Sequence, residues 1–185
     1  MAEPAARDAT YEDLLQVPAP LVAEILYGQL HAHPRPAARH ARASSMLGGK
    51  LIDPFDSGLG GPGGWWILDE PEVHLERHVV VPDIAGWRRE RMPVLPDAAW
   101  LELAPDWVCE VLSPATAQTD RSVKLPLYGE QGVAHLWLVD PALRTLEAYE
   151  LRGGKWLLLA TLKEDDPVRL PPFDAIEFSL AALWA

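Results

Sequence analysis

The 185-residue sequence has almost no cysteine and no long apolar run. Its single cysteine, Cys109, excludes an intramolecular disulfide and a metal site built from a cysteine cluster. No apolar stretch approaches the about 20 residues that a membrane-spanning helix needs. The N-terminus also lacks the basic and then apolar pattern of a signal peptide. We therefore expect a cytoplasmic protein that does not contact a membrane.

Positive charge is also scarce. The chain has 16 Lys and Arg against 27 Asp and Glu, which gives a formal net charge of −11 at pH 7. Such a surplus of acids argues against tight, non-specific binding to nucleic acid, because that binding depends on neutralising phosphates with Lys and Arg. It leaves open a nucleic-acid enzyme with a local basic groove.

The composition is otherwise that of an ordinary globular protein, with 49% hydrophobic and 23% charged residues. A chain of this length can bury one sizeable core, and it contains no internal repeat. We expect residues 1–9 to form a flexible N-terminal tail and residues 10–185 to form a single domain.

Two short apolar runs each contain an acid: Asp83 lies in residues 79–85 and Glu110 in residues 107–112. Apolar runs rich in β-branched residues are typical of buried strands. An unpaired carboxylate inside such a strand costs several kcal/mol or has to hold a proton. A cation between the two acids, most simply a divalent metal ion, would remove that cost. The alternative is that each acid caps a strand end or pairs with an arginine.

The second of these runs begins a strand–helix–strand unit. A helical pattern that starts between Thr116 and Asp120 extends to about Gln131, and a further strand follows at 134–139. Such a crossover makes its two strands parallel neighbours in one sheet. Further strands are expected at 65–68, 78–87, 144–151 and 155–162. The fold class that follows is α/β, with a central mixed β-sheet flanked by helices.

Side chains alternate along the strand at 107–112, and this decides which of them share a face. Val108, Glu110 and Leu112 lie on one face, and Cys109 lies on the other. We therefore interpret Cys109 as a core residue rather than a nucleophile.

A second long helix is expected from Pro36 to about Leu51, and it is the most basic part of the chain. Its cations are Arg35, Arg39, Arg42 and Lys50. Two interpretations stay open: a solvated helix face, or a wall that faces phosphates.

The acids of the two central strands suit a hard divalent cation. Mg²⁺ is typically held by one or two carboxylates and keeps water or substrate phosphate in its other positions. Asp83 and Glu110 can supply the carboxylates, and the backbone carbonyl of Val111 can supply a third oxygen. Lys124 can orient or deprotonate the attacking water, or stabilise charge on a phosphate. This set of groups suits hydrolysis of a phosphodiester bond.

The order of these pieces resembles the Uma-two family of bacterial nucleases, which belongs to the PD-(D/E)XK superfamily. The resemblance spans about Tyr11 to Leu183. Its motifs here are Glu24 with Gly28, Val81-Pro82-Asp83, Cys109 to Pro114, Asp120-Arg121 with Lys124, Tyr128, Gly132-Val133 and Leu136 to Pro141. The resemblance implies a restriction-endonuclease-like fold.

The resemblance to this family also implies roles for individual residues. Asp83 and Glu110 would be metal ligands, Lys124 would be the family's lysine on the following helix, and Glu24 would add to the metal or water network. The superfamily usually has a lysine two residues after the motif Glu; Leu112 occupies that position here.

The leading hypothesis is a Mg²⁺- or Mn²⁺-dependent endonuclease that cleaves DNA, with a homodimer expected because two copies are needed to cut both strands. An alternative is a catalytically inactive nuclease-like module for binding or assembly, which the net charge and Leu112 favour. A glycoside hydrolase is a weaker alternative, because strand cores account for most of the eight tryptophans.

Overall fold

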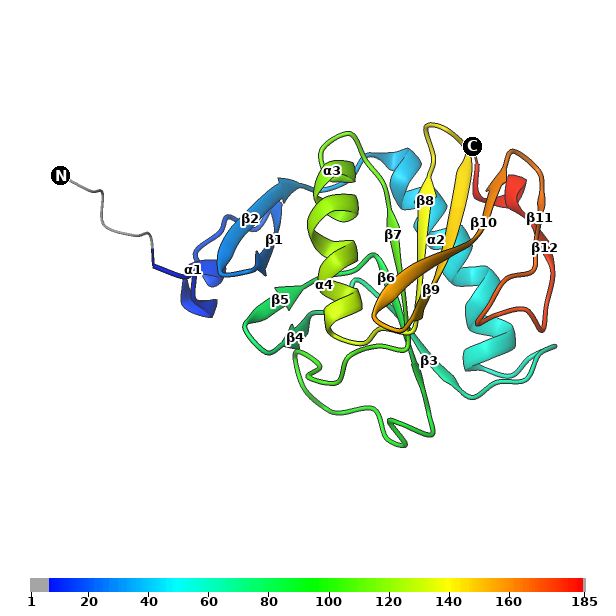
Figure 1. Cartoon of the computed structure of the whole chain (residues 1–185), viewed down its shortest axis with the longest axis horizontal. Helices are drawn as coiled ribbons and strands as arrows, with labels where there is room; N and C mark the ends of the chain where they lie inside the picture. Colours follow the sequence, from blue (N-terminus) through cyan, green and yellow to red (C-terminus); the bar gives the residue numbers. More distant parts are fainter. Residues whose placement is uncertain (1–6, 185) are drawn as a thin grey trace.

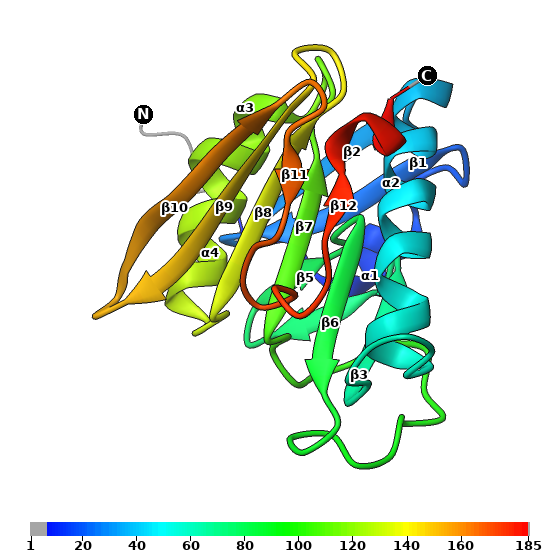
Figure 2. The ribbon, with the colours of Figure 1, turned by 90° about the vertical axis from the view of Figure 1, so that its right-hand side faces the viewer.

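The computed structural model describes residues 7–184. Its centre is a six-stranded sheet in the order β10-β9-β8-β7-β6-β3 (Figure 2). The strands are β3 (Trp65–Asp69), β6 (Ile84–Arg88), β7 (Trp107–Val111), β8 (His135–Asp140), β9 (Thr145–Arg152) and β10 (Lys155–Lys163). The pair β7–β8 is parallel, and the other neighbours in this sheet are antiparallel. The predicted mixed sheet with a parallel crossover is therefore confirmed.

Helices cover both faces of this sheet (Figures 1 and 2). The crossover between β7 and β8 consists of α3 (Ala117–Thr119), the π-helical segment η2 (Asp120–Lys124) and α4 (Leu125–Glu130). On the other face lies α2 (Ala38–Leu51), which continues into the π-helical segment η1 (Ile52–Asp56). The wide π-helical turn of η2 ends just before Pro126 in the first turn of α4. Because proline has no N–H and its ring crowds the preceding turn, this irregularity is expected there.

The alternation predicted for residues 107–112 is confirmed. Trp107, Cys109 and Val111 lie in the core on the α2 side, whereas Val108 and Leu112 lie in the core on the α4 side. Cys109 is fully buried in this core, and its burial raises the pKa of the thiol well above its usual value. Glu110 shares the face of Val108 and Leu112, which turns its carboxylate toward the crossover helix.

A second, four-stranded sheet has the order β2-β1-β5-β4. Its strands are β1 (Leu21–Leu26), β2 (Gln29–Pro34), β4 (Val73–Leu75) and β5 (His78–Val80), and α1 (Tyr11–Leu15) packs against it. The hairpin β1–β2 turns at Tyr27 and Gly28, whose φ angles are 50° and 76°. Buried side chains of this sheet join the α4-side core.

The prediction of one continuous strand at 78–87 is wrong. The chain leaves the small sheet after Val80 and enters the large sheet at Ile84, so β5 and β6 belong to different sheets. Pro82 lies in the gap and cannot donate a hydrogen bond to a strand ladder, which favours such a break. Asp83 therefore lies at the junction of the two sheets rather than in the middle of a strand.

The remaining elements cover the α2-side core. They are the pair β11 (Pro167–Val168) and β12 (Phe178–Ser179), followed by the 3₁₀ helix η3 (Leu180–Leu183). Of the predicted tail, residues 1–6 lie outside the described part, and the Ala9 N–H donates to the carbonyl of Gly28 at 2.8 Å. Within residues 7–184, none of the helices has the length and apolarity needed to span a bilayer.

Candidate active site

Lys124 lies between two buried carboxylates. Its Nζ is 2.7 Å from Oε1 of Glu110 on β7 and 2.9 Å from Oε1 of Glu24 on β1. All three side chains are almost fully buried. Glu24 also accepts the backbone N–H of Val81 at 2.8 Å. The lysine of the crossover helix therefore joins the large sheet to the small one.

Asp83 has a different partner. Its Oδ1 is 3.2 Å from Nε2 of His40 on α2, and its Oδ2 accepts the N–H of Val111 at 2.7 Å. This position follows from topology: β6 and β7 are antiparallel, so the start of β6 lies beside the end of β7. The two motif acids reach the same end of the sheet.

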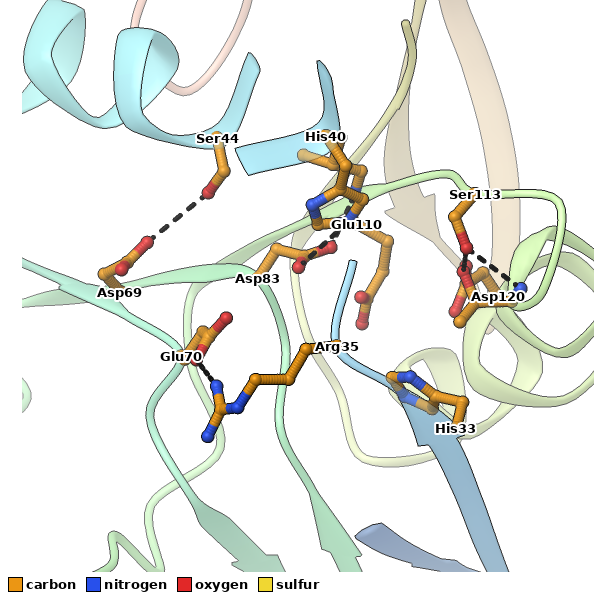
Figure 3. A network of polar contacts seen from close by, with 12 residues as sticks. His33, Arg35, His40, Ser44, Asp69, Glu70, Asp83, Glu110, Ser113 and Asp120 are labelled. Carbon is orange, nitrogen blue, oxygen red and sulfur yellow. Dashed lines mark hydrogen bonds and ion pairs between the residues drawn. The ribbon is translucent and has the colours of Figure 1, made fainter. Parts of the chain in front are cut away.

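Both acids line one pocket, together with Asp120, Lys124, His40 and other residues of β1, β2 and the loop after β7. Figure 3 shows Asp83, Glu110 and Asp120 around this space. The pocket volume is about 30 Å³, enough for about two water molecules. A second pocket of about 90 Å³ adjoins it through His33, Thr116 and Asp120.

Carboxylates outnumber cations in this cluster. Glu24, Glu110, Asp83 and Asp120 gather around one lysine and one histidine, with Asp120 at 4.0 Å from the Lys124 ammonium. No arginine within residues 7–184 forms an ion pair with Asp83 or Glu110. Of the predicted alternative, the pairing of each acid with an arginine is therefore not found within residues 7–184, whereas the other half, an acid that caps a strand end, fits the contact of Asp83 with the Val111 N–H.

The surroundings change the proton affinities of these groups. Burial acts to lower the pKa of Lys124, but the charges of Glu110 and Glu24 outweigh it and hold the pKa well above its usual value. Burial raises the pKa of Asp120 to about 6, against the opposing effect of Lys124. The lysine is therefore a fixed ammonium, whereas the acids compete for too few cations.

Burial also acts to lower the pKa of His40, but the hydrogen bond and charge of Asp83, with the backbone of Val111, raise it above its usual value. The Nδ1 atom of this buried ring has no hydrogen-bond partner in the described chain.

Tyr128 completes the surroundings of Glu110. Its hydroxyl donates to Oε1 of Glu110 at 2.6 Å, and the tyrosine is fully buried. The same oxygen thus accepts hydrogen bonds from both the tyrosine and the lysine, whereas Oε2 of Glu110 has no ion-pair or hydrogen-bond partner among the described side chains.

The four predicted site residues Glu24, Asp83, Glu110 and Lys124 are thus neighbours in the fold, three of them joined directly through Lys124. For Val111 the observed contact to Asp83 comes from the N–H, and the role of its carbonyl stays a prediction. Leu112 is buried in the α4-side core, where the superfamily lysine would be expected, and the ammonium comes from the helix instead.

Sequence reasoning missed His40 and Asp120 as members of this site. His40 lies in the predicted helix from Pro36 to Leu51 without a role of its own, and Asp120 is only part of a motif. The spacing of Asp120, Lys124 and Tyr128, four residues apart along a helix, was an available signal, because such residues share one face.

Two other groups of polar side chains, the basic turn after β6 and His33, form no ion pair with Asp83 or Glu110 within residues 7–184. Of the basic turn after β6, Arg89 pairs with Asp56 and Arg91 pairs with Asp106. His33 approaches Glu24 only to 3.9 Å. Across residues 7–184, no three or more His, Cys, Asp or Glu side chains are grouped so that they alone could hold a metal ion.

A mixed sheet with helices on both faces, and an Asp, a Glu and a Lys at one end of its central strands, defines a restriction-endonuclease-like α/β domain. The family model of Uma2, described as "Putative restriction endonuclease", matches residues 9–182. The chain belongs to this family.

A solved structure supports the same fold. It is described as "a putative nuclease belonging to DUF820 from Anabaena variabilis", with 25% sequence identity and a TM-score of 0.73. The match covers 95% of this chain and 97% of that chain. Comparison with curated proteins gives no match.

Proposed function

We propose that the protein is a metal-dependent endonuclease that hydrolyses phosphodiester bonds of DNA. The single observation that carries the proposal is the common pocket of Asp83, Glu110 and Lys124, three groups that come from different elements of the chain. Membership of a family described as restriction endonucleases supports the same reaction class.

The donor set fits Mg²⁺ or Mn²⁺. Such cations accept one or two carboxylates and fill their other positions with water or phosphate oxygens. Asp83 and Glu110 provide two carboxylates beside a space large enough for water, and the cluster has more acids than cations.

When bound, the ion would polarise the phosphoryl oxygen and lower the pKa of a bound water. The chain's own residues would do the rest. Asp83 and Glu110 would hold the ion, and Lys124, already a fixed ammonium, would donate a hydrogen bond to the attacking water or stabilise charge on the phosphate. Glu24 would keep Lys124 in place from the small sheet.

The test is cleavage of supercoiled plasmid and of a labelled duplex in Mg²⁺, in Mn²⁺ and in EDTA. We expect cleavage by the wild type only with metal, and none by Asp83→Ala. A matched control is Asp69→Ala, an exposed acid on the neighbouring strand β3 that does not line the pocket. Equal cleavage by wild type and Asp83→Ala would overturn the assignment.

A second candidate is a nuclease-like domain that binds or assembles without catalysis. One observation favours it: Lys124 and His40 already pair with the two motif acids. Calorimetric titration with Mn²⁺ separates the candidates. The nuclease proposal expects binding that Glu110→Gln weakens strongly, whereas the inactive module expects no difference between the two proteins.

We also propose a homodimer, because a single active site cuts one strand at a time and a twofold pair can cut both. Light scattering on the purified protein tests it directly: a mass of one chain at the concentration used for cleavage contradicts it. A cytoplasmic location stays a prediction.

A further inference from the structure

The segment before and along α2 has an unusual charge. Residues 25–52 contain no Asp or Glu, although the chain has 27 of them. The same segment contains Arg35, Arg39, Arg42 and Lys50. In a protein with a net charge of −11, it forms a local basic surface.

Arg39 and Arg42 on this helix are exposed. Neither forms an ion pair with an acid of residues 7–184, whereas eight other arginines do. Those eight are Arg7, Arg35, Arg77, Arg89, Arg91, Arg121, Arg144 and Arg152. Two neighbouring arginines three positions apart repel each other without an intervening acid, a small cost that an anionic partner would remove.

The basic surface adjoins the candidate active site. Pro36 and His40, which flank Arg39, both line the pocket of Asp83 and Glu110. Arg35, which precedes Pro36, lies 3.8 Å from Glu70, another residue that lines this pocket. Figure 3 marks this ion pair. A chain that follows α2 toward its N-terminus therefore arrives at the pocket.

The start of α2 is also suitable for an anion. Among residues 7–184, no side chain caps the helix at Ala37, so its first N–H groups keep their partial positive charge. These N–H groups favour negative charge beside the helix start.

We propose that the exposed face of α2 binds the phosphate backbone of a DNA strand, through Arg39 and Arg42, and leads that strand to the pocket of Asp83 and Glu110. The inference rests on the proposed nuclease function and adds to it the surface that holds the substrate. Lys50 lies about 16 Å beyond Arg39 at 1.5 Å per residue, so the surface is long enough for several phosphates.

Binding is measured apart from cleavage, by fluorescence anisotropy of a labelled DNA duplex in EDTA over a series of NaCl concentrations. The variant is Arg39→Gln/Arg42→Gln. The matched control is Lys155→Gln/Lys163→Gln, which removes two exposed lysines from β10, at the opposite edge of the sheet from β3. Both variants change the net charge equally, so a difference between them reports position rather than total charge.

We expect the α2 variant to bind about tenfold more weakly at low salt. Its plot of log affinity against log salt should be shallower by about 1.8, since each lost phosphate contact removes about 0.9. The control should keep the wild-type slope. Equal losses in both variants, or an unchanged slope in the α2 variant, would overturn the inference, as would a wild type that does not bind the duplex at low salt.

The two proposals fail separately. A wild type that binds DNA through α2 but never cleaves it leaves this inference standing and contradicts the nuclease. Metal-dependent cleavage that persists unchanged in Arg39→Gln/Arg42→Gln, with normal affinity, leaves the nuclease standing and contradicts the inference. Circular dichroism of each variant checks the fold. We expect spectra like that of the wild type, because the substituted side chains are exposed.

Discussion

Lys124 reaches Glu110 from the helix that follows the strand of Glu110, with 2.7 Å between Nζ and Oε1. The superfamily usually places this lysine on the strand itself, where this chain has the buried Leu112. The amine and the carboxylate thus meet in space although fourteen positions separate them in sequence. Because the crossover helix packs on the face of the sheet that carries Glu110, a lysine on the inner side of this helix can reach the carboxylate of Glu110.

Removal of this amine should destabilise the protein. Lys124→Met keeps the volume but leaves Glu24 and Glu110 buried without their cation. We expect a loss of about 3–5 kcal/mol in the free energy of unfolding at pH 8, measured by urea denaturation. Lys163→Met, which changes an exposed lysine on β10, should stay within about 0.5 kcal/mol of the wild type. Similar values for both variants would contradict a buried ion pair at Lys124.

Glu24 should act through Lys124 rather than by binding the metal, because its observed partners are the lysine and the Val81 N–H. Glu24→Gln should therefore lower the rate of cleavage about 10- to 100-fold and leave the affinity for Mn²⁺ unchanged. Rate and calorimetric affinity are measured on the same preparation. Glu102→Gln, at an exposed acid outside the pocket, is the control and should keep both values. A parallel loss of Mn²⁺ affinity in Glu24→Gln would instead make Glu24 a ligand.

The sequence was sufficient to predict much of the fold, since periodicity is a local property. The apolar run at 107–112, the helix after it and the strand at 135–140 follow from residue patterns alone. The break between β5 and β6 does not, because residues 79–85 are apolar on both sides and only Pro82 signals a change of sheet. The exact position of Asp83 required the pairing of strands that are far apart in sequence.

Part of the site could also be predicted from local sequence. The apolar runs around Asp83 and Glu110 identified both acids, Lys124 follows Glu110 closely in the chain, and the family resemblance supplied Glu24. The contact of His40 with Asp83 joins α2 to the gap before β6 and has no local signature. Burial of Asp120, and hence its raised pKa, likewise depends on packing between the helix and the small sheet.

Asp120 should make stability depend on pH. The folded protein holds its proton up to about pH 6, whereas the unfolded chain releases it near the ordinary value of 3.8. The folded state therefore binds more protons between these values, and stability falls as the pH rises through this window. Asp120→Asn keeps the neutral form at every pH, so we expect it to be about 2–3 kcal/mol more stable than the wild type at pH 8 and similar to it at pH 4.

Urea denaturation of wild type and Asp120→Asn at both pH values measures this difference. Asp97→Asn, at an exposed aspartate, controls for the general effect of removing one negative charge. A gain of the same size in the control, or a gain in Asp120→Asn that does not grow with pH, would show that the buried carboxyl is not the cause.

The hydroxyl of Tyr128 should matter more than an equivalent hydroxyl near the surface. Tyr128 is fully buried and donates to Glu110 at 2.6 Å, whereas the partly buried Tyr149 donates to Glu147 at 2.8 Å. Each Tyr→Phe change removes one hydrogen bond to a carboxylate and keeps the ring. Water can replace the donor at Glu147 more readily than at Oε1 of Glu110, which faces Tyr128 and Lys124 in the core. We expect Tyr128→Phe to cost about 1–3 kcal/mol in urea denaturation and Tyr149→Phe less; the reverse order would mean that the hydrogen bond to Oε1 of Glu110 contributes little to stability.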